Sequence, residues 1–247
     1  MSIGTQAVDR ALMILQAFST QRLRRGVTEL AKDLGVHVST ASRLASTLEG
    51  RGFLERVPGN RTYQLGPELG RLGLLALGRH DLLAAAWESM ERLADRTGET
   101  VNLAVLDRGE AVNIAQVDGK HIVGVGQWAG RRNQLHGAAN GKVLLAFGGA
   151  EIGKGPFERF TPRTITDAAR LKAEVEKVRR QGWAMAVGEL ENELNAVAAP
   201  VYDPRGVCRA ALSVAGPSYR VSPKRLRDMA TLCMKAAEDI GQRLGRS

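Results

Sequence analysis

The sequence predicts an α+β protein of two domains: a small N-terminal helix-turn-helix with a wing, and a larger C-terminal domain built on an antiparallel sheet. A length of 247 residues is typical of a chain with two domains. Three helical periodicities and two short extended segments fill the first 66 residues. The remainder alternates short apolar segments with helical ones, which is typical of an antiparallel sheet with helices packed against it.

The composition narrows the class of protein. Hydrophobic residues make up 44% of the chain and charged residues 25%, as in ordinary globular proteins. The formal net charge of +9 favours an acidic partner, and nucleic acid is the usual one. Cys208 and Cys233 are isolated in the sequence, so we expect no disulfide framework and a cytoplasmic location. Neither an apolar signal core nor a bilayer-length apolar stretch is present, so we expect no membrane partner.

The first 66 residues read as three helices and a hairpin. Apolar residues recur at helical spacing in residues 6–19, and a polar, basic stretch follows. Thr28 is expected to be the N-cap of the second helix, and Gly35 to end it. The third helix is expected over residues 38–49, and Pro58-Gly59-Asn60 forms a turn between two extended segments. These segments are residues 53–57 and 61–65.

The rest of the chain reads as a linker helix and a second domain. Gly66-Pro67 follows the hairpin, and residues 68–79 form a glycine-interrupted helix. Turns such as Asp107-Arg108-Gly109 separate short apolar segments, as in an antiparallel meander. We therefore expect a first domain at 1–66, a linker helix at 67–80 and a second domain at 81–247. Further helices are expected at residues 81–97, 138–147, 167–181 and 222–244, and strands at 101–106, 111–117, 122–128, 183–187, 195–202 and 207–215.

The pattern within residues 27–48 is that of a helix-turn-helix that reads DNA. The small side chain of Ala31 allows its two helices to approach closely, and Gly35 supplies the positive φ that the turn needs. Hydroxyl groups suit phosphate oxygens and base edges, and arginine suits guanine or phosphate. The start of the second helix carries such groups, and the wing carries Arg56 and Arg61. The candidate DNA-binding residues are Thr28, Ser39, Thr40, Ser42, Arg43 and Arg61.

The charge of the first 66 residues is modest. Nine Lys and Arg residues against five Asp and Glu residues give a net charge of +4. This charge favours a few phosphate contacts per protomer, so useful affinity requires a dimer on two half-sites of a palindromic double-stranded operator. A three-helix domain that binds protein, or nothing, is the alternative.

The segment of residues 135–142 is a candidate ligand site because small residues there precede an apolar helix. The free N–H groups of a helix start favour an anion such as a carboxylate. A tight helix–sheet corner requires small residues for the same reason, so the segment alone leaves both interpretations open. Glu189 lies in an acidic loop of the kind that is usually just solvated. Ser213 stands in an apolar strand, where its hydroxyl either bonds the backbone or faces a cavity.

Motifs for catalysis or metal binding are missing from the sequence. The four histidines show no metal spacing, and no GxSxG, HExxH or P-loop occurs. We therefore expect no catalytic residue, no metal and no cofactor. Two alternatives to a ligand-controlled regulator stay open at this point: an enzyme that turns over its ligand in the C-terminal domain, and a DNA-architectural protein without a ligand.

Taken together, these motifs resemble the IclR family of bacterial transcriptional regulators over nearly the whole chain. The resemblance implies a GAF-like effector domain, homodimers formed through the N-terminal domains, often homotetramers, and control of catabolic genes. Family effectors are small carboxylates, from glyoxylate and pyruvate to aromatic acids, and the carboxylate meets N–H groups that fall here at Ala139 and Asn140. The resemblance rests on residues 26–31, Ser39-Thr40, Arg43-Leu44, 63–66, Leu135-His136, Ala139, Gly141-Lys142, 198–201, Asp203, Ser213 and Gly216-Pro217. The candidate effector-binding residues are Leu135, Ala139, Asn140, Glu189, Leu194, Ala196 and Ser213.

Two departures from the family pattern affect the expected ligand and the expected DNA contact. Positions that hold Asp, Cys and a second Ser in relatives hold Ala186, Ala196 and Ala215 here. A less polar and roomier cavity is expected, which favours a larger and partly apolar acid, such as an aromatic acid, over glyoxylate. His37 stands where the family often has Ser or Pro, which leaves the cap of the recognition helix open.

Overall fold

The structure is a computed structural model that describes residues 6–19, 22–77, 80–121 and 124–245. It divides into two compact units, with the boundary between His80 and Asp81. Helices and antiparallel sheets occur in both units, so the predicted α+β class is confirmed. None of the helices within the described ranges combines the length and the apolar character that a bilayer span requires.

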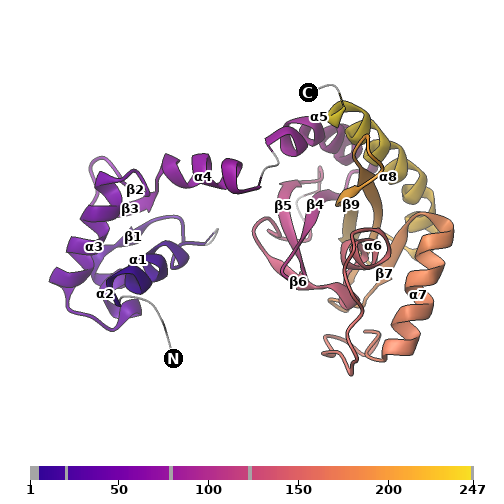
Figure 1. The fold of residues 1–247 in the computed structure, drawn as a ribbon, viewed down its shortest axis with the longest axis horizontal. Coiled ribbons are helices and arrows are strands. Elements are labelled where there is room, and N and C mark those ends of the chain that lie inside the picture. Colours follow the sequence, from indigo (N-terminus) through magenta and orange to yellow (C-terminus); the bar gives the residue numbers. More distant parts are fainter. Residues whose placement is uncertain (1–5, 20–21, 78–79, 122–123, 246–247) are drawn as a thin grey trace. The chain divides into compact units, whose positions relative to one another are not determined.

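The first unit consists of helices and a small three-stranded antiparallel sheet (Figure 1). The sheet order is β1-β3-β2, and β2 and β3 form the predicted wing hairpin. Residues from all three main helices and from the wing share one core, which includes Ile14, Leu30, Ala45, Leu54 and Tyr63. The elements are α1 (Gln6–Gln16), β1 (Arg25–Gly26), α2 (Val27–Leu34), α3 (Val38–Gly50), β2 (Leu54–Arg56), β3 (Thr62–Leu65) and α4 (Pro67–Leu77).

The start of α2 differs from the prediction. Its N-cap is Gly26, so the prediction that Thr28 is the N-cap is wrong, and Thr28 lies exposed in the first turn of the helix. The physical reason is Glu29, whose Oε2 accepts a hydrogen bond of 2.8 Å from the Gly26 N–H and begins the helix two residues earlier. Gly35 ends α2 in the left-handed region, with φ 62°, as predicted.

A six-stranded antiparallel sheet forms the centre of the second unit, with the order β6-β5-β4-β9-β8-β7. Helices α5 and α8 contribute to the hydrophobic core on one face, and α6 and α7 contribute to the core on the other (Figure 1). The strands are β4 (Thr100–Asp107), β5 (Glu110–Val117), β6 (Arg132–Gln134), β7 (Ala184–Val187), β8 (Leu194–Tyr202) and β9 (Cys208–Pro217). The helices are α5 (His80–Thr97), the short 3₁₀ helix η1 (Leu135–Gly137), α6 (Ala139–Phe147), α7 (Ala168–Gln181) and α8 (Pro223–Leu244).

The two faces of this sheet differ in side-chain size. On β9, Leu212 and Val214 point to the core of α5 and α8, whereas Ala211 points to the core of α6 and α7. Small residues on the second face allow α6 to lie close to its surroundings. At Gly141 a Cβ atom would meet the Leu135 carbonyl oxygen at 2.3 Å, so this position admits only glycine without movement of the backbone.

The strand predicted over residues 122–128 is absent from the described part of that range. Residues 122–123 lie outside the described residues, and residues 124–128 carry no strand. The Gln116 side chain occupies this edge of β5 instead, since its Nε2 donates to Gly126 O at 3.1 Å and its Oε1 accepts from Trp128 N at 2.7 Å. Pairing with β5 resumes at β6, which the sequence did not predict.

Candidate functional site

The recognition helix α3 begins at His37, which acts as its N-cap. The ring Nδ1 of His37 accepts a hydrogen bond from Ser39 N at 3.3 Å and lies 2.8 Å from Ser39 Oγ. Histidine therefore performs the capping that a serine would perform in the first turn. The departure from the family pattern at this position leaves the helix start intact.

One face of α3 is buried and the other is open. Ala41 and Ala45 are fully buried against the rest of the unit, which turns Ser42 and Arg43 outward. Exposed hydroxyl and guanidinium groups on a helix of this kind are suited to phosphate oxygens and base edges. Of the other candidates, Ser39, Thr28 and Arg61 are exposed, and Thr40 is half-buried.

Two cations of the first unit make contacts within it, and one of them is buried. Arg25 is only 4% exposed; its Nη1 donates to Ala17 O at 2.8 Å, and its Nη2 pairs with Asp33. Arg56 pairs with Glu49 at 3.3 Å and donates to the Tyr63 hydroxyl at 2.5 Å. Neither contact leaves a local signal in the sequence, because the partners lie 7 or 8 residues away. Arg56 itself remains 54% exposed on the wing.

The second unit contains a small pocket between the start of α6 and the sheet, with a cavity volume of about 40 Å³. Five of the seven candidate effector residues line it: Ala139, Asn140, Leu194, Ala196 and Ser213. None of the described residues that line the pocket carries a charge. The other lining residues are Asn102, Asn113, Trp128, Asn133, Gly137, Ala138, Ala186, Leu190 and Ala215.

The first residues of α6 line this pocket. The N-cap is Ala138, whose side chain makes no capping hydrogen bond. The first N–H groups of a helix lack intrahelical acceptors and carry the positive end of the helix dipole. Because Ala139 and Asn140 begin the helix and line the pocket, an anion in it would meet backbone N–H groups rather than a charged side chain.

Alanines form a row across the floor of the pocket. Ala186 on β7 is opposite Ala196 on β8, and Ala196 is opposite Ala215 on β9. The three positions at which the sequence lacks the polar residues of relatives therefore adjoin one another. Together they give the floor a small and apolar surface.

Asparagines give the pocket a polar wall that sequence reasoning missed, apart from Asn140. Asn140 Nδ2 donates to Asn113 Oδ1 at 3.1 Å, and Asn140 Oδ1 accepts from Gly141 N at 2.8 Å. Asn102 and Asn133 also line the pocket. The available signal was an asparagine inside otherwise apolar strands, as at Asn102 in β4 and Asn113 in β5. The alanine floor is therefore only part of the lining, and amide groups keep the rest polar.

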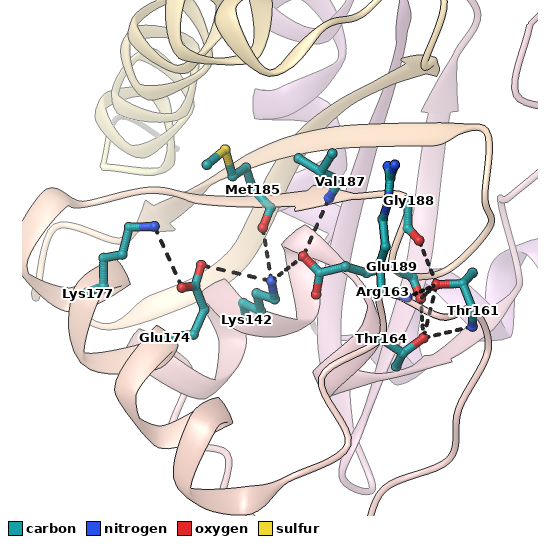
Figure 2. A network of polar contacts seen from close by, with 10 residues as sticks. All are labelled: Lys142, Thr161, Arg163, Thr164, Glu174, Lys177, Met185, Val187, Gly188 and Glu189. Carbon is teal, nitrogen blue, oxygen red and sulfur yellow. Dashed lines mark hydrogen bonds and ion pairs between the residues drawn. The ribbon is translucent and has the colours of Figure 1, made fainter.

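Glu189 is not among the residues that line the pocket, because it is bound to Lys142 (Figure 2). Lys142 on α6 is completely buried; its Nζ donates to Glu189 Oε1 at 2.7 Å and to Met185 O at 3.0 Å. Glu174 on α7 lies 3.9 Å from the same Nζ. Burial raises the pKa of Glu189, and the neighbouring Lys142 opposes that rise.

Two threonines hold the backbone of the same loop (Figure 2). Thr161 Oγ1 donates to Gly188 O at 2.6 Å, and Thr164 Oγ1 donates to Glu189 O at 2.7 Å. Leu190 follows directly and lines the pocket. The Lys142–Glu189 pair and the threonines therefore fix the loop that supplies one wall of the pocket. Leu135, the seventh candidate, is buried in the core shared with α6 and is not among the lining residues.

The described residues contain no group of three or more His, Cys, Asp or Glu side chains that could hold a metal ion. No cofactor is implied by the residues that line the pocket.

Comparisons with known proteins agree with this geometry. Residues 7–58 match the IclR helix-turn-helix domain, and residues 74–242 match the C-terminal domain of the bacterial transcriptional regulator IclR. The chain belongs to the IclR family. The predicted resemblance is thereby confirmed, and the chain is a DNA-binding transcriptional regulator that responds to a small molecule, not an enzyme.

Relatives match the chain over nearly its full length. The regulator KdgR of Escherichia coli K12 is 34% identical over 98% of this chain and 94% of its own. The glycerol operon regulatory protein of Streptomyces griseus is 32% identical, over 90% of this chain and 89% of its own. An IclR homolog from Microbacterium hydrocarbonoxydans, solved in complex with 4-hydroxybenzoate, is 26% identical with a TM-score of 0.84, covering 98% of this chain and 100% of that chain.

Proposed function

We propose that this IclR-family regulator binds a palindromic operator as a homodimer or homotetramer, and that a carboxylic acid larger than glyoxylate controls this binding in the cytoplasm. In this proposal residues 1–66 read the DNA, residues 67–80 link the two domains, and residues 81–247 bind the effector. The genes under control are catabolic genes for that acid.

The DNA half of the proposal rests on the open face of α3. Ser39, Thr40, Ser42 and Arg43 lie at its start, with Thr28 on α2 and Arg61 at the wing tip as further contacts. Arg25 is engaged inside the unit, and the net charge of residues 1–66 is only +4, so phosphate contacts from one protomer give modest affinity. A dimer on two half-sites supplies the missing affinity. The exposed apolar residues of α1 support a dimer through this unit; they are Val8, Leu12 and Met13.

The effector half rests on one observation: the start of α6, whose N-cap Ala138 makes no side-chain capping bond, lies at a pocket whose described lining contains no charge. The backbone N–H groups of Ala139 and Asn140 are suited to a carboxylate. The alanine floor, together with Trp128 and Leu190, is suited to an apolar body larger than glyoxylate. The relative that binds 4-hydroxybenzoate gives independent support for an acid of this size.

Control of DNA binding requires that the acid bind with unequal affinity to two arrangements of the paired DNA-binding domains. Whichever arrangement binds the acid better becomes more populated when the acid is present. The affinity for the operator then changes by the ratio of the two affinities for the acid. The acid must therefore bind more weakly, or more tightly, to the operator complex than to the free protein.

The DNA half is tested by selecting genomic fragments with the full-length protein and footprinting the site. A sharp palindromic footprint is expected, whereas a diffuse one would favour a DNA-architectural protein. Arg43→Ala should weaken operator binding by about 1–3 kcal/mol, because a guanidinium contact to a base or phosphate is lost, and should leave effector binding unchanged. Unaltered operator affinity would remove Arg43 from the reading surface.

The effector half is tested by calorimetric titration of the full-length protein with glyoxylate, pyruvate, benzoate and 4-hydroxybenzoate. The larger acids should bind more tightly than the two small oxoacids. Tight binding of glyoxylate or pyruvate, with no binding of the benzoates, would contradict the proposed size class.

A further inference from the structure

One apolar side chain of α3 faces solvent. Val38, the first residue of the helix, is 43% exposed. The other apolar residues of α3 turn inward. Ala41 and Ala45 are buried, whereas Leu44 and Leu48 are partly buried and pack against the core of the first unit. Val38 takes no part in that core, so its side chain is available to a partner outside the chain.

The position of Val38 distinguishes it from an apolar residue scattered on an ordinary surface. In helix-turn-helix proteins, the residues at the start of the second helix contact base edges in the major groove. The His37 cap holds this turn in helical form, through the hydrogen bond from Ser39 N to the ring Nδ1. Ser42 lies one turn beyond Val38 on the same side of the helix and is also exposed. Val38 therefore lies among the side chains that are candidates for reading DNA.

The polar residues of α3 offer little to an A·T pair. Adenine is recognised in the major groove by the amide of Asn or Gln, and α3 contains neither residue. Arg43 suits guanine or a phosphate. The Ser39 hydroxyl lies 2.8 Å from His37 Nδ1, so it is engaged at the cap. An A·T pair must then be recognised at this helix by something other than an amide.

Thymine presents a methyl group in the major groove, and an apolar side chain is the group that contacts it. Val38 is the one large apolar side chain of α3 that the structure leaves exposed. Contact between the valine methyl groups and the thymine methyl group removes apolar surface of both from water. The chemistry of Val38 therefore matches thymine.

We propose that Val38 recognises the methyl group of a thymine in each half-site of the operator. This inference rests on the proposed function, in which α3 reads the DNA. It adds a base preference that the hydroxyl and guanidinium groups of the helix do not supply. A pyrimidine without the methyl group loses the apolar contact and is bound less tightly at that position.

The test replaces thymine by deoxyuridine, which keeps the base pair and removes only the methyl group. The operator is the footprinted fragment, and each thymine of one half-site, on both strands, is replaced singly. The affinity of the full-length protein is measured by fluorescence anisotropy at one fixed salt concentration. One replacement should weaken binding by the wild type about fourfold, the effect of one methyl group returned to water.

Val38→Ala shortens the side chain and should reduce the deoxyuridine effect at that position to less than about twofold, with the effects at other positions unchanged. Val38→Ser is the second variant, since serine is also short and is well tolerated in the first turn of a helix. Val207→Ala is the matched control, because Val207 is a 50% exposed valine of the second unit. It should keep the full effect.

A wild-type protein that is insensitive to every deoxyuridine replacement would overturn the thymine contact. Sensitivity that persists in both Val38 variants, or that is also lost in Val207→Ala, would overturn its assignment to Val38. In each case a loss of operator affinity in Arg43→Ala would still support DNA reading by α3. Operator affinity that is unchanged in Arg43→Ala and in both Val38 variants would overturn that part of the proposed function together with this inference.

Discussion

Replacing Lys142 with methionine should destabilise the second unit by about 3–5 kcal/mol, the usual range when one member of a buried ion pair is removed. The Lys142 side chain is 1% exposed and that of Glu189 is 12% exposed. The substitution deletes the hydrogen bonds to Glu189 and Met185 O. It leaves the Glu189 carboxylate with a 3.4 Å contact from Val187 N and an Oε2 that already has no partner among the described residues.

A second substitution separates the cost of the unpaired charge from the value of the pair. In Lys142→Met/Glu189→Leu neither charge of the pair remains, and replacing a buried pair by apolar residues of similar volume is often neutral or stabilising. The double variant should therefore recover most of the loss. Lys177→Met is the matched control, since its side chain is 44% exposed and its Nζ pairs with Glu174 at 3.6 Å. It should cost less than about 1 kcal/mol.

The assay uses the tryptophans of the chain. Trp87, Trp128 and Trp183 all lie in the second unit, so tryptophan fluorescence during urea unfolding reports on that unit alone. A single-variant cost below about 1 kcal/mol, or a double variant that loses the sum of both single effects, would refute the reasoning.

The pH dependence gives an independent check. Burial holds the pKa of Glu189 above its usual value of 4.5, so its ionisation opposes folding as the pH rises through the raised pKa. Without Lys142 that pKa rises further, because the attraction that lowered it is gone. The deficit of Lys142→Met should therefore be largest near neutral pH and shrink as the pH falls toward 4.5. A deficit that grows on acidification would contradict this sign.

Two further predictions concern glycine and cysteine. Gly141→Ala should destabilise the second unit by about 1–3 kcal/mol and weaken effector binding, because its Cβ would lie 2.3 Å from Leu135 O and displace the start of α6. Gly153→Ala, whose Cβ meets nothing closer than 3.5 Å, is the control; equal urea midpoints for the two variants would contradict the close approach. Burial raises the pKa of Cys208 to about 11 and that of Cys233 to about 12, so iodoacetamide at pH about 8 should label neither quickly in the native protein and both after unfolding. Rapid native labelling of Cys233 would show that the core around it opens.

The parts of the fold that depend on local pattern were predictable. Gly35 ends α2 as predicted, and small residues before an apolar run located the start of α6. The two-residue strand β1 was missed because its partners, Thr62 and Tyr63, lie far along the chain. A pairing of that kind leaves no local periodicity to detect.

Residues of the candidate site could be predicted only where the sequence signal lies within a single segment. Ala139 and Asn140 were found from their own segment, whereas Asn102 became part of the pocket through pairing with Ser213, 111 residues away. The ion pair of Lys142 and Glu189 joins residues 47 positions apart. A lysine in the sequence reads as solvent-exposed until its carboxylate partner is brought to it by the fold.

The alanine row of Ala186, Ala196 and Ala215 makes the protein a convenient starting point for engineered biosensors. The row lies on one face of the sheet, and the residues between these positions belong to the opposite face, so the size of the ligand chamber can be altered without entering the core beneath α5 and α8. Each alanine can be exchanged for serine, valine or leucine to add a hydroxyl or to fill space. Libraries limited to these three codons, screened with a reporter gene, would redirect the response to other acids while the DNA-reading unit keeps its operator.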